Sequence, residues 1–400
     1  MSPRRATKPK PASPDWLTFL QFGLGALGIA LAWMLALAVL LGSMMQAVQN
    51  GLQLFSSLVE LVPIAVIFLI GMLLLPSTIY SFRRILGKEP VPFKISHRWG
   101  LTIFFFPPML AAGGWAVANG PGWLALSALL LGTLLLVAWL LWIALRDLQP
   151  GSAQRAWGAF GSGLAATPAL AFILEAIGLV AVILLLTVYV EVNPALADAV
   201  NALQNVSAEN PDQLVQSLAP FFNDPFVLFS ILISLSFFVP LIEELLKPLA
   251  VYLLMGRKLS EAQGFALGAL SGAGYALVEN LTLNTQPETL FLVAVARIGA
   301  SAMHIFTAAL SGYALVRAKN TKRILPLLGI LALNITLHGL WNGMVLLSAA
   351  SESGGGGPVV AAISSFAVPV MLSVTLGSLI FMYIMNRSMH RTPAGKIVTR

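Results

Sequence analysis

The sequence predicts an all-α fold, a polytopic membrane helical bundle of about ten transmembrane helices with both termini in the cytoplasm. Two facts of composition lead to this class: 58% of the 400 residues are hydrophobic and only 10% are charged. Soluble domains carry about 25% charged residues, so a chain this apolar belongs in a bilayer. The third observation is where the basic residues fall between the apolar stretches, because their placement indicates the topology.

Ten apolar stretches approach or exceed the length of about 20 residues that a helix needs to cross the hydrocarbon core. They are residues 17–42, 53–80, 101–119, 123–145, 163–190, 226–255, 264–285, 290–316, 324–350 and 359–385. The first stretch follows a basic tail and is too long for the apolar segment of a signal peptide, so we expect a retained first span.

The basic residues lie on one side of this arrangement. Of the 23 Lys and Arg, all except Lys247 and Arg297 lie outside the spans, in the two tails and the even-numbered connectors. Because positive charge marks the cytoplasmic side of membrane proteins, we expect a cell-membrane protein whose two ends face the cytoplasm. The formal net charge of +7 is then a topological bias, and we expect no nucleic-acid partner.

The spans and connectors divide the chain into five predicted regions. These are a cytoplasmic basic tail (1–16), a five-helix membrane region of open role (17–190), an acidic extracytoplasmic connector (191–225), a polar-rich core (226–350), and the last span with a cytoplasmic tail (351–400).

Outside the core region, few features point to chemistry. Glu60 and Glu175 are isolated carboxylates in the first five spans, and we interpret them as structural. The acidic connector has apolar residues at helical spacing, which predicts one or two short amphipathic helices, either as a solvated connector or as a lid. Residues 205–207 match a glycosylation sequon.

Span 226–255 carries three ionisable residues within five positions. Glu243, Glu244 and Lys247 stand in an otherwise apolar stretch, where a charge costs at least about 2.5–3.5 kcal/mol. On a helix, Glu243 and Lys247 are one turn apart in the order that favours an ion pair, whereas Glu244 lies about 100° away and is not paired by this spacing. Pro248 has no N–H group, so we expect a kink there. The motif is either a structural ion pair or a reaction or transport site.

The next span combines small residues with two polar ones. Gly264, Gly268 and Gly272 are spaced by four, which predicts a close helix contact. Glu279 and Asn280, near the other end of the span, have no such structural explanation.

Two later spans carry polar side chains at helical spacing. Arg297, Ser301 and His304 share one face of the first, and His338 and Asn342 are one turn apart on the second. A lone histidine in a helix is usually a core residue, but a histidine that faces other polar helices indicates a functional role.

The helical rise places four of these groups at one depth. Counted from the cytoplasmic end of each span, Glu243 and His304 lie roughly 18 Å deep, His338 roughly 21 Å and Glu279 roughly 22 Å. Arg297 lies nearer the outer face. Successive spans run in opposite directions, so sequence spacing does not impose this agreement. We therefore expect one site near the middle of a core about 30 Å thick.

Histidines and carboxylates at one depth suit a divalent metal ion. Catalytic zinc takes three N or O ligands and leaves one position open, while a carboxylate that does not bind the ion acts as the base. The chain has no cysteine, which excludes thiolate ligands and a cysteine nucleophile. We expect a divalent metal, in the simplest case zinc. The candidate ligands are His304, His338, Glu279 and Asn342.

The order of these motifs resembles the PrsW family of intramembrane proteases, part of a wider group with the type II CAAX prenyl proteases. The resemblance covers about residues 235–345. It is carried by Glu243-Glu244-x-x-Lys247, Tyr275-x-x-x-Glu279-Asn280, His304 and His338-x-x-Trp341-Asn342. It implies a membrane-embedded metalloprotease that cleaves membrane-anchored proteins near the bilayer surface. Glu279 stands where the CAAX relatives have a histidine, so its role as a ligand stays open.

The leading hypothesis is therefore an intramembrane metalloprotease. Either Glu243 or Glu244 is the base, and Lys247 orients or neutralises the other glutamate. Supporting residues are Asn280, Arg297 and Trp341. An alternative is a proton- or cation-coupled transporter that uses the same buried groups, although the first five spans show no inverted repeat of the later ones. A third is a non-catalytic membrane scaffold.

Overall fold

The computed structural model describes residues 14–49, 61–120, 122–204, 213, 216–281 and 290–390. Within these residues the chain is mainly helical, and its β-pairing is limited to one bridge between Pro92 and Ser152. The all-α prediction is confirmed. Glu60, the sequon at 205–207 and most of the two basic tails lie outside the described residues.

Helices follow one another closely along the chain. In order they are α1 (Trp16–Gln49), α2 (Leu61–Ile85), the 3₁₀ helix η2 (His97–Phe104), α3 (Phe106–Asn119), α4 (Gly122–Leu145), α5 (Ala153–Gly161), the π-helical η3 (Ser162–Ala166), α6 (Thr167–Glu191), α7 (Pro194–Gln204), α9 (Ala219–Asn223), α10 (Pro225–Ile233), the π-helical η4 (Ser234–Phe238), α11 (Val239–Leu246), α12 (Leu249–Leu254), α13 (Glu261–Leu281), α14 (Leu290–Thr321), α15 (Leu325–Glu352), α16 (Gly357–Ser364) and α17 (Ala367–His390).

Nine helical stretches in the described part of the chain are long and apolar enough to cross a membrane. The tenth predicted span, residues 264–285, is occupied by α13, which is not among them. Its sequence is rich in Gly, Ala and Ser, and every residue from Gly264 to Leu277 is buried. A helix enclosed by other helices needs small residues for close packing rather than apolar side chains for lipid.

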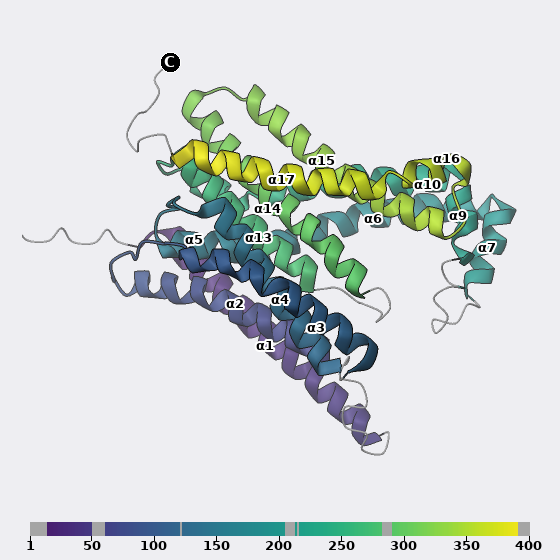
Figure 1. Cartoon of the computed structure of the whole chain (residues 1–400), viewed down its shortest axis with the longest axis horizontal. Coiled ribbons are helices and arrows are strands. Elements are labelled where there is room, and N and C mark those ends of the chain that lie inside the picture. The colour runs from purple at the N-terminus through teal and green to yellow at the C-terminus, as the bar shows by residue number, and fades with distance from the viewer. Residues whose placement is uncertain are drawn as a thin grey trace, which may run out of the picture.

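The centre of the bundle is the pair α13 and α14. Figure 1 shows this pair between α1–α4 on one side and α15 and α17 on the other. At Gly268 of α13, a Cβ atom would overlap the carbonyl oxygen of Ala308 in α14. On another face of α13, a Cβ at Gly274 would overlap the carbonyl oxygen of Phe160 in α5. The close contact expected from the glycine spacing is therefore observed, and it holds α14 rigidly beside α13.

The helix that carries the charged motif is broken where proline was expected to break it. Before Pro248, α11 ends at Leu246, and α12 begins at Leu249. The break leaves the carbonyl of Lys247 free of the helix, and Ser271 Oγ of α13 donates a hydrogen bond to it at 2.5 Å. The motif is thus tied directly to the central helix.

The acidic connector contains short helices, as predicted from its apolar spacing. They are α7, which buries Leu196, and the single-turn α9. Tyr189 at the end of α6 donates a hydrogen bond from its hydroxyl to Asp224 Oδ2 at 3.1 Å, which fastens the far end of the connector to the bundle.

Candidate active site

Carboxylate and imidazole side chains from three helices meet inside the bundle. Glu243 of α11, His304 of α14 and His338 of α15 each place a potential ligand atom within 4.8 Å of the other two. All three side chains are buried. The rings of His304 and His338 stand edge to face, with their centroids 4.9 Å apart. The structure therefore brings together residues that are far apart in the sequence.

The ammonium group of Lys247 lies at the centre of this cluster. Its Nζ is 2.5 Å from Glu244 Oε1 and 3.4 Å from Glu243 Oε2. The same atom is 2.6 Å from His304 Nδ1 and 3.5 Å from His338 Nδ1. Glu243, Glu244 and His304 thus direct acceptor atoms at one cation in the buried interior, where an uncompensated charge would cost several kcal/mol.

The expectation that Glu244 is unpaired was wrong. It forms the shorter of the two ion pairs with Lys247, at 2.5 Å against 3.4 Å for Glu243. Side chains three residues apart on a helix are neighbours, as are those four apart, so both glutamates can reach the lysine. Glu243 is four residues before Lys247 and Glu244 is three residues before it, and both spacings allow an ion pair.

Glu279 orients the ring of His304. Its Oε2 is 2.9 Å from His304 Nε2 and 3.2 Å from a guanidinium nitrogen of Arg297. An ionised carboxylate can only accept, so Nε2 carries the proton and Nδ1 presents its lone pair to the centre of the cluster. A carboxylate behind a histidine in this way is the usual support of a metal-binding imidazole.

The donor set fits a divalent metal ion. Two imidazoles with one carboxylate are a common ligand set of catalytic zinc. In addition, Glu243 Oε2 and Glu244 Oε2 are buried and accept no hydrogen bond from the described residues. A buried acceptor without a partner is costly, and a cation or a water molecule would satisfy it.

Three residues predicted to take part lie beside the cluster and connect helices. Asn342 of α15 donates through Nδ2 to the carbonyl of Leu235 in η4 at 3.0 Å. Asn280 of α13 donates to Ser301 Oγ of α14 at 2.8 Å. Trp341 packs in an apolar cluster between α14 and α17. These contacts fix the helices that carry the two histidines.

Glu175 lies closer to the cluster than its isolation in the sequence indicated. Its helix α6 packs on α11 and α13 through Ala171, Ile242 and Tyr275. One turn beyond Ala171, Glu175 interacts electrostatically with Glu243, and its Oε1 is buried without a hydrogen bond from the described residues. A depth count would have indicated this, because Glu175 is 12 residues into its predicted span, roughly 18 Å from the start of that span.

The exposed edge of the cluster is the pair formed by Glu279 and Arg297. Their side chains are 26% and 32% exposed, whereas Glu243 and Lys247 are 6% and 0% exposed. Glu279 lies two residues before Leu281, the last residue of α13 that the structure describes.

The comparisons with known proteins agree with this geometry. A family model described as PrsW family intramembrane metalloprotease matches residues 156–378. The matched interval is more than half of the chain and contains every residue of the cluster, including Glu175. Comparison with curated proteins and with solved structures finds no match.

Proposed function

The chain belongs to the PrsW family of intramembrane proteases, and from this premise we propose that it is a metal-dependent endopeptidase that cleaves membrane-anchored proteins. The observation that carries the proposal is the convergence of Glu243, His304 and His338 within 4.8 Å. Hydrocarbon offers neither water nor a base for peptide hydrolysis. The helices must therefore supply the base and bind the water molecule with polar side chains, which are expensive to bury in a membrane.

Glu243, His304 and His338 would hold the ion. Zinc suits this set of N and O donors. When bound, it would activate a water molecule and polarise the scissile carbonyl. Lys247 and the ion share an acceptor, because Nζ already lies 2.6 Å from His304 Nδ1, so the ammonium group and the metal compete for this nitrogen.

Glu244 is the residue that we assign as the general base. Its Oε1 is fixed by Lys247 Nζ at 2.5 Å and by His338 Nδ1 at 3.0 Å, while Oε2 accepts no hydrogen bond from the described residues. A carboxylate held at one oxygen and open at the other can take the proton of the attacking water at Oε2. It can then deliver that proton to the nitrogen of the leaving amine.

We assign substrate entry to the edge formed by Glu279 and Arg297. A membrane-spanning helix satisfies its own backbone groups, so its carbonyls are hidden until part of it unwinds. The exposed edge lies near the end of α13, where the end of a substrate helix can unwind at lower cost than in the middle of the bilayer. The unwound end of the substrate would pass this edge to reach the cluster, which the helical rise places near the middle of the core. The distribution of basic residues supports a location in the cell membrane with both termini in the cytoplasm.

Metal analysis combined with a cleavage assay tests the proposal. The purified wild type should hold one zinc ion, or its functional equivalent, per chain and should cleave a membrane-anchored reporter. His304→Ala and His338→Ala should each lower the metal content below one per chain and abolish cleavage. The matched control is His97→Ala, because His97 is exposed in η2 and should change neither readout.

One result would overturn the metal-dependent mechanism while keeping the protease. A fully active preparation without stoichiometric metal would assign the chemistry to Glu243 and Glu244 as an acid–base pair. If instead the protein binds metal but cleaves no membrane-anchored reporter, the proposed endopeptidase activity is wrong.

A further inference from the structure

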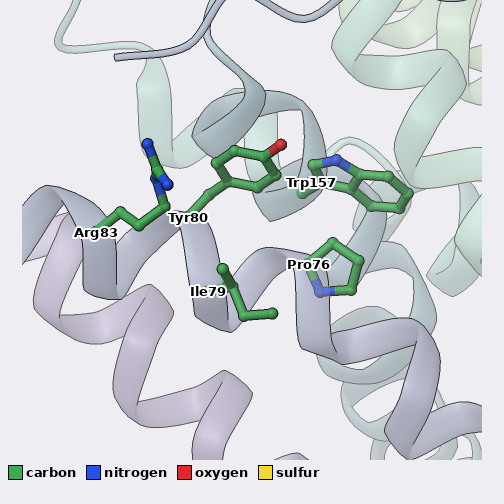
Figure 2. A pocket seen from close by; sticks show the side chains of 5 residues that line it. All are labelled: Pro76, Ile79, Tyr80, Arg83 and Trp157. Atoms are coloured by element: carbon green, nitrogen blue, oxygen red, sulfur yellow. The ribbon is translucent and has the colours of Figure 1, made fainter. Parts of the chain in front are cut away.

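A pocket of about 350 Å³ lies between α2 and α5, outside the buried cluster. Pro76, Ile79, Tyr80 and Arg83 of α2 line it together with Trp157 of α5. Figure 2 shows the Arg83 side chain at one end, the Trp157 ring at the other and the Tyr80 ring between them. The pocket thus combines an apolar floor and two aromatic rings with one cationic end.

Positive charge surrounds the cationic end. An adjoining hollow shares Tyr80 and Arg83 with the pocket and adds Arg84, Lys88 and Glu89. Arg83 is exposed, and no ion pair within the described residues includes it. Three cations against one carboxylate leave a net positive site, so the complementary ligand is an anion.

The position of the pocket indicates what kind of anion. The spanning helix α2 ends at Ile85, and Arg83 lies in its last turn, at the end that the basic connectors mark as cytoplasmic. Tyrosine and tryptophan are enriched at this interface of a membrane. Ile79 is 52% exposed and Phe82 is 45% exposed, so the apolar floor continues onto a surface of α2 that faces lipid.

We propose that this pocket binds an anionic glycerophospholipid of the cytoplasmic leaflet. The guanidinium of Arg83 holds the phosphate, since its planar fork matches two phosphate oxygens. The glycerol and the first part of an acyl chain lie over Pro76, Ile79 and the Trp157 ring. Basic pockets at the cytoplasmic ends of transmembrane helices bind anionic headgroups.

Two features of the pocket select this ligand over related ones. Free inorganic phosphate would contact Arg83 but would leave the apolar floor uncovered. Phosphatidylcholine would place its own cation near Arg84 and Lys88, where like charges repel. This site gives the N-terminal helices a ligand of their own, independent of the proteolytic chemistry.

Lipid binding to the purified full-length protein in detergent tests the proposal. Native mass spectrometry and thermal unfolding would be compared with phosphatidylglycerol, phosphatidylcholine and inorganic phosphate at equal concentration. We expect phosphatidylglycerol alone to bind and to raise the Tm. Arg83→Ala should weaken its apparent affinity about fivefold, which is the contribution of one basic residue near a membrane surface. Arg98 is an exposed arginine at the start of η2 that does not line the pocket, so Arg98→Ala should leave the affinity unchanged.

A second variant tests the apolar part of the site. Ile79→Glu places a carboxylate on the exposed floor and should also weaken phosphatidylglycerol binding. Unchanged binding in both Arg83→Ala and Ile79→Glu would place the lipid elsewhere. Equal binding of phosphatidylcholine, an equal effect of inorganic phosphate, or an equal loss in Arg98→Ala would each overturn the proposal. None of these results depends on the cleavage assay.

Discussion

The central helix α14 and the N-terminal helix α1 bury their residues to opposite degrees. In the most apolar stretch of α14, 89% of the residues are buried, against 11% in α1, although the mean hydropathy of that stretch is only 1.3 in α14 and 2.5 in α1. Lipid tails are as apolar as leucine, so hydrophobicity does not drive one transmembrane helix onto another. Of these two helices, the less apolar one is enclosed by other helices, and it carries His304 of the candidate active site.

Polar groups follow the same division. Among the described residues of α14, Ser301 and His304 each contact a polar side chain of α13. Along α1, the exposed side chains include Leu24, Leu31 and Leu35. The central helices therefore place polar pairs inside the bundle, whereas α1 exposes leucines along much of its length and also makes polar contacts with α2, as from Gln21 Nε2 to Ser77 Oγ at 3.0 Å.

The largest expected effect comes from neutralising Glu244. Glu244→Gln should lower proteolysis by about 10²–10⁴-fold or more, because it removes the proposed base. It should also lower stability by about 3–5 kcal/mol, since the buried Lys247 ammonium loses its closest partner. Cleavage of a membrane-anchored reporter and thermal unfolding in detergent measure the two effects.

Glu243→Gln provides the matched comparison within the motif. It should also abolish or strongly reduce cleavage, with a smaller loss of stability because the shorter ion pair, from Glu244 to Lys247, remains. Glu191→Gln, at the exposed end of α6, is the control and should behave as the wild type. If both motif variants cleave at the wild-type rate, this motif is not the reacting centre.

Replacing a glycine by alanine should destabilise the protein in α13 but not in α1. Gly268→Ala forces a Cβ into the carbonyl oxygen of Ala308 in α14, and overpacking of this kind costs about 1–3 kcal/mol. Gly23→Ala in α1 meets no atom within 4 Å, so its effect should stay within about 1 kcal/mol. Thermal unfolding of the two variants measures the difference. Equal Tm shifts would show that the small residues of α13 do not set its packing.

Hydropathy and the position of proline were enough to predict most of the helices of the fold. Nine of the ten predicted spans coincide with apolar helices, and the break at Pro248 follows from its missing N–H group. The enclosed helix α13 needed its glycine spacing to be recognised. The π segments η3 and η4 were not predicted, because no local residue pattern specifies an extra residue in a helical turn.

The sequence predicts how deep each site residue lies along its helix, but not toward which neighbouring helix its side chain points. The constant rise of a helix brought His304 and His338 to one level, and the structure shows their rings 4.9 Å apart. Which side chains turn toward the centre depends on how the helices pack against one another. For this reason the contact of Asn342 with η4 was visible only in three dimensions. The pairing of Glu244 with Lys247 and the depth of Glu175 could have been read from the sequence, from a spacing of three residues and from the helical rise.

Removing Arg297 should have an intermediate effect that tests the exposed edge. The guanidinium group of Arg297 pairs with the carboxylate of Glu279 at 3.2 Å. Because Glu279 in turn holds His304 at 2.9 Å, Arg297→Ala should reduce cleavage about tenfold through metal affinity. Its cost in stability should stay below about 1 kcal/mol, since the pair is partly exposed.

Arg297→Lys distinguishes the charge of Arg297 from a direct role. It keeps the charge beside Glu279 and should recover part of the cleavage and of the bound metal. An inactive Arg297→Ala protein with full stability and an unchanged metal content would instead place Arg297 in contact with the substrate.

The smallest expected effect is that of Asn342→Ala. Asn342 lies one turn from His338 and donates its Nδ2 hydrogen bond to Leu235 in η4 at 3.0 Å, away from the acceptors that surround Lys247. Hydrogen bonds between transmembrane helices contribute about 0.6 kcal/mol on average, so the Tm should fall slightly. The metal content should stay near that of the wild type, whereas His338→Ala loses the ion. A loss of metal in Asn342→Ala as complete as in His338→Ala would make Asn342 a ligand and would replace the set of Glu243, His304 and His338.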